Sequence, residues 1–349
     1  WASIYSGSTP SPDGAPFMLR HDSTQRSFFD QTLYDRLIKP GHFLRRLDAV
    51  IDLGFVHRLC RGCYAKESGR PAASPVMLFK ILLLQFLHDI SDRRIVEEVR
   101  YNMAFKWFCG LEADEEPPHP TTLTRFRARL GPKRFARIHN RIVALARERG
   151  LVSDRLSIVD ATHVETRMNS FKVDDENPPD PDARRGGRGG GKTFVGYKAH
   201  LALDADSRIL TQGETTPANV HEGRKLHEVL EKNARRVTAD KAYDSNRNHH
   251  LLNGSGIRSA IILKRNRLGH PLGGMRSNRW IRDDQRKRRR IEPKMAELKH
   301  LHGLARARYW TLPKMKIQLH LAVIAANVKR IVKLLSAGAN PPDMALGRV

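Results

Sequence analysis

The chain has 349 residues, 40% of them hydrophobic, and is long enough to bury the cores of about two domains. Lys and Arg number 62 against 37 Asp and Glu, which gives a formal net charge of +25. This composition excludes a generally disordered chain, and no run reaches the ~18 apolar residues that would span a bilayer. The excess of positive charge favours a polyanionic partner, above all nucleic acid, although a ribosome-associated protein or a membrane-surface binder would share it.

The first half of the chain is predicted to be helical. Residues 1–41 are rich in Ser, Pro and Gly and are expected to form a flexible arm. Apolar residues then recur at helical spacing, and we expect a basic, all-helical domain over residues 42–152, which would bind DNA or support assembly. Within it, Ser74 and Pro75 are typical of an N-cap and a first helical turn, and they predict a helix over residues 76–87.

A long amphipathic helix is predicted over residues 133–149, ending at Gly150. The helix before it carries Arg125 and Arg129, which are candidate DNA contacts. Short helices with basic faces resemble helix-turn-helix architecture in a generic way. A solvated face of a helical bundle, or a surface that pairs protomers, would give the same pattern.

Strand patterns begin after Gly150, in a domain predicted over residues 153–336. Residues 174–192 combine Asp, Pro and Gly runs and are expected to form a mobile loop, and residues 337–349 a tail. The predicted elements are strands at 156–159, 194–203 and 209–215, a helix at 221–233, and strands at 237–239 and 257–263. This order predicts an α+β fold, in which the helical domain precedes a ribonuclease H-like mixed β-sheet with flanking helices. The apolar helix over residues 316–335 is expected to cover the sheet.

Three acidic residues are candidates for metal-dependent phosphoryl transfer. Asp160 and Asp240 each end a short apolar run that predicts a buried strand, and Glu292 lies in a dense arginine cluster. Carboxylate oxygens suit Mg²⁺, and a pair of such ions can activate water and neutralise charge on a phosphate. The three are far apart along the chain, so only the fold can bring them together. Asp244 is a rival ligand that could instead cap a helix.

Basic residues close to these carboxylates are candidate phosphate contacts. Arg288 and Lys299 flank Glu292, the first able to bind phosphate by a planar fork and the second as a point charge. Lys198 is a further candidate, on the same face of its strand as His200. The remaining candidates belong to the basic run before Glu292: Arg286, Arg289 and Arg290. A solvated loop is the alternative explanation of that run.

Several stretches, taken in order, resemble bacterial insertion-sequence transposases of the DDE class, particularly the insertion-sequence-five group and its relatives. The resemblance covers roughly residues 30–335. The matching stretches are Gly-Arg-Pro at 69–71, Ser-Pro-Val-Met-Leu-Phe-Lys at 74–80, His-Pro-Thr-Thr-Leu-Thr-Arg-Phe-Arg at 119–127, Ile-Val-Asp-Ala-Thr at 158–162, Gly-Tyr-Lys-Ala-His at 196–200, Thr-Ala-Asp-Lys-Ala-Tyr at 238–243 and Arg-Ile-Glu at 290–292, continuing to Gly-Leu at 303–304. Arg288, Glu292 and Lys299 match the family's Tyr-Arg-Glu-Lys signature. Gln285 stands at the tyrosine position, a departure that concerns the tyrosine's supporting role and leaves the metal ligands intact.

The resemblance implies a DNA transposase in which Asp160, Asp240 and Glu292 hold two Mg²⁺ ions, with Mn²⁺ able to substitute. Water would cut the transposon end, and the freed 3′-hydroxyl would attack target DNA. The implied partners are double-stranded DNA, as terminal inverted repeats and target, and further copies of the chain in a homo-dimer or higher oligomer, with no membrane partner. Three cysteines offer no disulfide framework, so the bacterial cytoplasm, in association with the nucleoid, is the expected location. The alternatives are a non-catalytic DNA-binding regulator descended from a transposase, and a plain metal-dependent nuclease.

Overall fold

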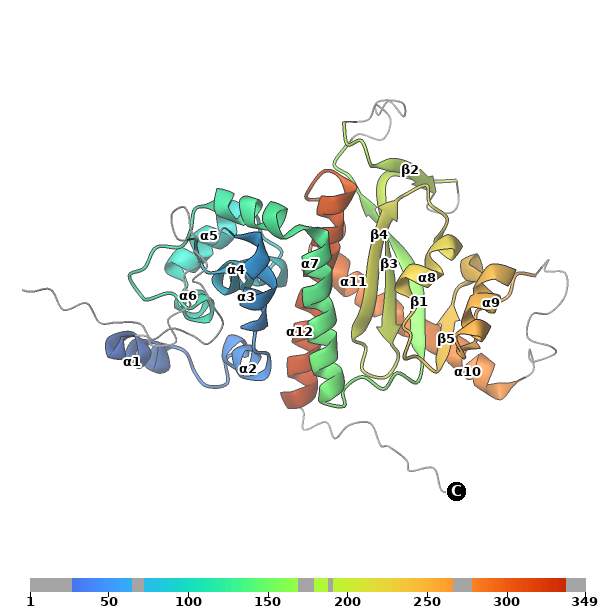
Figure 1. Cartoon of the computed structure of the whole chain (residues 1–349), viewed down its shortest axis with the longest axis horizontal. Helices are drawn as coiled ribbons and strands as arrows, with labels where there is room; N and C mark the ends of the chain where they lie inside the picture. Colours follow the sequence, from blue (N-terminus) through green and yellow to red (C-terminus); the bar gives the residue numbers. More distant parts are fainter. Residues whose placement is uncertain (1–26, 65–71, 169–178, 188–190, 266–277, 337–349) are drawn as a thin grey trace, which may run out of the picture.

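Helices build the first half of the computed structural model (Figure 1), which describes residues 27–64, 72–168, 179–187, 191–265 and 278–336. In chain order they are α1 (Phe28–Leu37), α2 (Phe43–Val50), α3 (Phe55–Cys60) with the 3-10 turn η1 (Arg61–Cys63), α4 (Pro75–Leu87), α5 (Asp92–Tyr101), α6 (Met103–Cys109) and α7 (Pro120–Glu148). The predicted helix start at Ser74 is confirmed, because the Ser74 hydroxyl accepts a hydrogen bond from the Met77 N–H. Pro75 occupies the first turn.

The prediction of a flexible arm over residues 1–41 is wrong for the part that the structure describes, since helix α1 lies there. Residues 1–26 of that arm lie outside the described residues. Residues 28–37 form a helix instead, which begins where the Ser27 side chain accepts from the Asp30 N–H. Tyr34 is fully buried, and its hydroxyl donates to the Leu111 carbonyl 2.9 Å away. This anchor holds the segment against the helical half, a long-range contact that local composition does not encode.

Helix α7 connects the helical half to the sheet. It bends at Gly131, whose φ of 66° lies in the left-handed region that favours glycine, and Pro132 follows directly. The amphipathic helix predicted over residues 133–149 is the second half of α7. Its apolar face is buried at Phe135, Ile138 and Ile142.

A mixed sheet forms the second half of the molecule (Figure 1), as the predicted α+β class requires. Strand β1 (Ser157–Glu165) runs antiparallel to β3 (Thr193–Asp204), which is followed by β4 (Leu210–Pro217) on its other edge. On the opposite side, β1 pairs in parallel with β5 (Arg236–Ala239), and β5 with β6 (Arg258–Ser259). Antiparallel strands beside parallel ones are the arrangement of a ribonuclease H-like sheet.

Three predicted elements of this half differ in the structure. Part of the expected mobile loop at 174–192 is the edge strand β2 (Arg184–Gly187), which pairs with β3. Strand β2 can lie there because Gly186 has no side chain: a Cβ at this position would come within 2.7 Å of the Ala218 carbonyl oxygen. The remaining differences concern lengths: the helix expected at 221–233 is only the 3-10 turn η2 (Glu222–Lys225) and α8 (Leu226–Val229), and the strand expected at 257–263 is only the two-residue β6.

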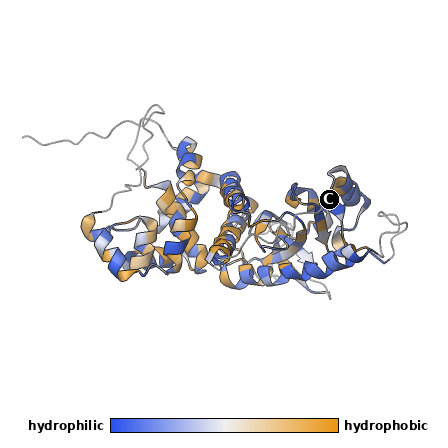
Figure 2. Ribbon diagram, turned by 90° about the horizontal axis from the view of Figure 1, so that it is seen from below, coloured by the Kyte–Doolittle hydropathy of each residue, from blue (hydrophilic) through white to orange (hydrophobic). Residues whose placement is uncertain are grey.

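The remaining helices carry the third candidate carboxylate and close the core. They are η3 (Lys241–Tyr243), α9 (Asn246–Gly254), α10 (Arg279–Lys287), η5 (Arg288–Arg290), α11 (Ile291–Leu301) and α12 (Leu312–Ser336). Helix α12 packs against the sheet as expected, but also against α7 and α4 of the helical half (Figure 1). One hydrophobic core therefore runs from α4 through α12 to β3, and Figure 2 shows hydrophobic segments in the helical half and along the central helices.

Candidate active site

Asp160 and Asp240 lie beside each other on neighbouring strands. The parallel register pairs Val159 of β1 with Ala239 of β5, so each aspartate is the residue that follows this pair in its own segment. Strand β5 ends at Ala239, and Asp240 begins the 3-10 turn η3. The side chain of Asp160 is only 17% exposed. Two short apolar runs thus bring together carboxylates that are 80 positions apart in the sequence (240 minus 160).

The side chain of Arg288 lies between Glu292 and Asp160 and contacts both carboxylates. The Arg288 guanidinium lies 3.2 Å from Asp160 Oδ2 through Nη1, and 3.6 Å from Glu292 Oε1 through Nη2. Glu292 stands in the first turn of α11, with its side chain 57% exposed. Among the described residues, no three His, Cys, Asp or Glu side chains converge closely enough to hold a metal ion. In this conformation a cation of the protein itself joins Asp160 to Glu292.

The electrostatic surroundings of Asp160 favour its neutral form. Burial raises the pKa of Asp160 to about 6, and the negative charges of Glu222 and Asp240 act in the same direction. The Ala161 N–H, 2.8 Å from Asp160 Oδ1, and the Arg288 guanidinium oppose that rise. Since burial outweighs them, a cation bound beside Asp160 and Asp240 would stabilise the ionised pair.

Glu222 is an acidic neighbour that the sequence patterns did not indicate. It lies in η2, and its Oε1 is 3.3 Å from the Lys198 ammonium. No strand end or helical period marks Glu222, because its position depends on how the chain turns after β4. The same contact occupies Lys198, which also donates to the Val220 carbonyl at 3.2 Å.

Tyr243 adds an unsatisfied polar group to the acidic cluster. Its side chain is fully buried, and its hydroxyl has no hydrogen-bond partner among the described residues. Burial raises the pKa of Tyr243, and the charges of Asp160, Glu222 and Asp240 raise it further. Hard carboxylate oxygens with an unpaired hydroxyl beside them are chemically suited to a hydrated divalent cation. The donor chemistry of Asp160, Asp240 and Tyr243 thus suits a divalent cation, but among the described residues no third acidic or histidine side chain lies close enough to complete a ligand set in this conformation.

The rival ligand Asp244 has a structural role. Its Oδ1 lies 2.9 Å from His249 Nε2, and its Oδ2 accepts from the Lys264 N–H at 2.8 Å. Asp244 is 2% exposed, so these contacts hold it inside the fold.

The predicted phosphate contacts are distributed over several surfaces. Arg286, Arg288 and Arg289 line one cleft of about 650 Å³ next to the carboxylates. Arg290 points elsewhere, and its Nη1 donates to the Ala205 carbonyl at 2.9 Å. The last two candidates, Arg125 and Arg129, are exposed on α7 in the helical half, where Arg129 stacks on Tyr64.

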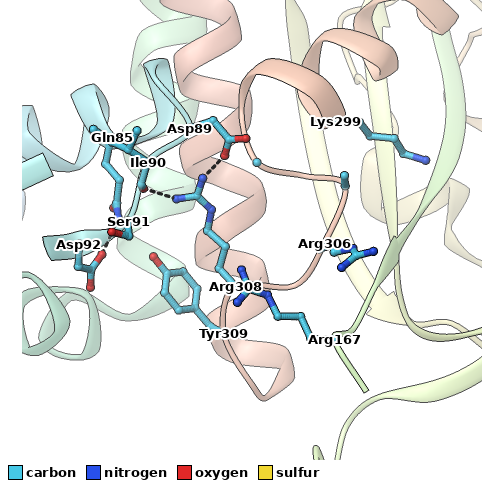
Figure 3. Close-up of a pocket in the computed structure, with 12 residues that line it drawn as sticks. Gln85, Asp89, Ile90, Ser91, Asp92, Arg167, Lys299, Arg306, Arg308 and Tyr309 are labelled. Carbon is cyan, nitrogen blue, oxygen red and sulfur yellow. Dashed lines mark hydrogen bonds and ion pairs between the residues drawn. The ribbon is translucent and has the colours of Figure 1, made fainter. Parts of the chain in front are cut away.

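Lys299 belongs to a second cleft, of about 540 Å³, between the helical half and the sheet (Figure 3). Its ammonium lies 3.4 Å from His163 Nε2 on β1. Arg167 and Arg306 line the same cleft, and their side chains have no ion-pair partner among the described residues. On the facing wall, Arg308 is paired with Asp89 (Figure 3). The cleft therefore presents cationic groups that sequence spacing did not connect with Lys299.

The topology of the sheet, with its acidic pair among basic clefts, defines a ribonuclease H-like protein. Residues 32–129 match the family described as Transposase domain (DUF772), and residues 152–328 match the family described as Transposase DDE domain. The second match alone covers more than half of the chain, which therefore belongs to the DDE transposase family. A solved structure titled "Cryo-EM structure of piggyBac transposase synaptic complex with hairpin DNA (SNHP)" is similar with a TM-score of 0.42 and 10% identity, over 86% of this chain and 77% of that chain.

Membership of this family confirms the predicted class: the protein is a DNA transposase that binds DNA, of a family that generally uses divalent metal ions. The insertion-sequence-five group within the class stays a prediction. Within the described ranges, none of the helices combines the length and the apolar content needed to cross a bilayer.

Proposed function

We propose that Asp160, Asp240 and Glu292 are the catalytic carboxylates, and that they hold two Mg²⁺ ions, for which Mn²⁺ can substitute. The observation that carries this proposal is that Asp160 in β1 and Asp240, the residue directly after β5, both follow the register pair of Val159 and Ala239. Such ions supply an activated water and neutralise charge that develops on the phosphate. The buried Tyr243 hydroxyl offers an unused hydrogen bond beside the same carboxylates.

The residues of the chain then bind and orient the DNA. Arg288 neutralises Asp160 and Glu292 in the structure, and it also lines the cleft that contains Arg286 and Arg289. A guanidinium can exchange a carboxylate for a phosphate, since both accept its parallel N–H donors. We expect Arg288 to turn toward the DNA backbone when the carboxylates bind cations, and Lys299 to contact phosphates from the cleft in Figure 3.

The DNA substrates proposed are double-stranded transposon ends, carrying terminal inverted repeats, and a target duplex. Cutting the first frees a 3′-hydroxyl, which attacks a phosphodiester of the second, so that one phosphodiester bond is exchanged for another. Arg125 and Arg129 on α7, Lys198 beside Glu222, and Arg290 are proposed as further phosphate contacts.

Joining two ends requires more than one copy of the chain, and we propose a homo-dimer or higher oligomer. Phe28 and Phe29 support this, because their side chains are 88% and 72% exposed next to each other on α1. Adjacent exposed aromatic residues are typical of surfaces that bind another protein. The proposed location is the bacterial cytoplasm, in association with the nucleoid.

Asp160→Asn tests the catalytic assignment. This change keeps the shape of the side chain but removes a ligand charge, so Mg²⁺-dependent cleavage of end DNA should be abolished while DNA binding persists. Glu116→Gln is the matched control, because Glu116 is 67% exposed and pairs with Arg100 in the helical half. Cleavage by Asp160→Asn at the wild-type rate would contradict the assignment.

Donor ends with a free 3′-hydroxyl and a plasmid target separate transposition from its alternatives. Joined products support the transposase. Cleavage without joining indicates a plain nuclease, and binding without either reaction indicates a regulator.

A further inference from the structure

A third basic cleft, of about 320 Å³, lies where the start of α11 meets α12 and the turn between β3 and β4. Arg208 comes from that turn, Arg290 from η5, and Lys294 from α11. Helix α12 contributes three more cations near its C-terminal end, Lys329, Arg330 and Lys333. Six cationic side chains from four elements thus line one cleft, although only Arg290 and Lys294 are close to Glu292 in the sequence.

Among the described residues, Glu297 is the one carboxylate that lines this cleft, and it already contacts several cationic groups. Its Oε2 lies 2.6 Å from Lys294 Nζ, and its Oε1 lies 3.5 Å from His302 Nε2 and 3.8 Å from Lys329 Nζ. Burial tends to raise the pKa of Glu297, but the close contact with His302 and the hydrogen bond from Lys294 outweigh burial and bring the pKa to about 2. Glu297 is therefore ionised at neutral pH and has no capacity left for the other cations.

Arg290 Nη1 lies 3.8 Å from Asp206 Oδ1, whereas Arg208, Arg330 and Lys333 have no carboxylate partner among the described residues and repel one another. Arg208 and Lys333 are exposed, and neither has an ion-pair partner among the described residues. Arg330 donates from Nε to the Ser207 carbonyl at 2.6 Å, a neutral partner. Burial lowers the pKa of Arg330, and the charge of Arg208 lowers it further. Lys294 is 6% exposed, and burial lowers its pKa; the hydrogen bond and charge of Glu297 oppose this shift, and the charges of Arg330 and Lys329 lower the pKa further.

We propose that this cleft binds the phosphodiester backbone of duplex DNA, which then passes over η5 toward the catalytic carboxylates. Bound phosphates would relieve the repulsion among the cations and release counterions. A single free phosphate would engage only part of the set, whereas the cations extend from Lys333 on α12 to Arg290 in the basic run beside Glu292. An extended polyanion can follow such a path. The proposal rests on the proposed transposase function, because it assigns a second contact surface to the same DNA.

The test uses the full chain and a labelled duplex of random sequence, with binding measured by fluorescence anisotropy over a salt titration. Arg208→Gln combined with Lys333→Gln removes two cations that support no ion pair, so folding should be preserved. If each contacts one phosphate, the slope of log Kd against log salt should fall by about 1.8, at about 0.9 per contact. The matched control is Lys232→Gln with Arg247→Gln, which removes two exposed cations of the catalytic half that lie outside the three clefts and have no ion-pair partner in the part of the chain that the structure describes. It should keep the wild-type slope.

The possible results distinguish a failure of the proposed DNA-binding cleft from a failure of the proposed transposase function. A wild-type slope in the Arg208→Gln and Lys333→Gln variant, or an equal fall in the control, would overturn the DNA site while leaving the transposase intact. Wild-type protein that fails to bind duplex DNA would overturn both. Thermal unfolding with added inorganic phosphate, at constant ionic strength, tests whether the cleft binds a small anion instead. If phosphate stabilises the wild type but not the Arg208→Gln and Lys333→Gln variant, and the two proteins bind DNA equally, then the ligand of the cleft is free phosphate and the DNA proposal is wrong.

Discussion

Acid should weaken the packing of α7 against α12, where two neutral histidines are buried. His139 of α7 and His320 of α12 have ring centroids 5.7 Å apart. His139 Nε2 lies 2.9 Å from the Leu210 carbonyl, and since a carbonyl only accepts, that nitrogen carries the proton. His320 Nδ1 is buried without a hydrogen-bond partner among the described residues. Burial lowers the pKa of His139 to about 4. Burial, with the charges of His139 and Lys316, lowers that of His320 to about 3.

The direction of the pH effect follows from these shifts. The ordinary pKa of histidine is 6.5, so between pH 6.5 and the folded-state values the unfolded chain binds protons that the folded chain does not. The stabilisation is complete above pH 6.5 and is lost as the pH falls through this window. At pH 5, His320 alone should cost about 2 kcal/mol of unfolding free energy relative to pH 8, at about 1.4 kcal/mol per pH unit.

His320→Phe isolates this contribution, because Phe preserves a planar ring and cannot bind a proton. We expect stability at pH 8 to stay the same or rise, since a buried nitrogen without a partner is removed. Between pH 8 and 5 the variant should lose about 2 kcal/mol less than the wild type in urea unfolding followed by circular dichroism. His227→Gln, at a side chain 46% exposed, is the control and should follow the wild type. Parallel stability curves for wild type and His320→Phe would refute the reasoning.

Two further substitutions test how the sheet is built and joined to α12. Asn327→Ala should lower the free energy of unfolding, measured in urea, by about 3 kcal/mol. The buried Asn327 side chain accepts a hydrogen bond from the Leu210 N–H at 2.9 Å and donates one to the Leu210 carbonyl at 2.8 Å. A decrease below about 1 kcal/mol would contradict this prediction. Gly196→Ala should cost at least about 3 kcal/mol or prevent folding, since a Cβ would come within 2.2 Å of the Val164 carbonyl. Gly254→Ala, where a Cβ meets nothing within 4 Å, is its control, and equal melting temperatures for the two would disprove the clash.

The sequence predicted the elements that local chemistry encodes. Ser74 and Pro75 placed the start of α4, because capping and proline geometry act within one turn. The apolar run before Asp160 is strand β1, although the strand extends further, to Glu165. Arg288 lies in η5, before α11, and Pro293 lies in the first turn of α11, where a proline is tolerated.

Elements that depend on distant partners were missed. The strand β2 has a glycine-rich sequence with no apolar alternation, and it is a strand only because β3 offers a free edge to pair with. Helix α1 was expected as part of an arm, since its anchor, from Tyr34 to Leu111, spans 77 positions. The helix expected at 221–233 is shortened to η2 and α8, and this shorter path places Glu222 near Asp160.

The identities of the candidate carboxylates and the positive charge of their surroundings could be read from residue types and their order, because ligand chemistry and net charge belong to individual side chains. The folded chain alone shows that Arg288 joins Asp160 to Glu292, that Glu222 adds charge beside them, and that cations from η5, α11 and α12 meet in one cleft. Ion pairs and clefts act over a few ångströms between segments that can be far apart in the sequence, as Arg288 and Asp160 are. The apolar pattern of residues 316–335 predicted that a helix covers the sheet, but it did not specify which side chains of α11, α12 and the sheet meet.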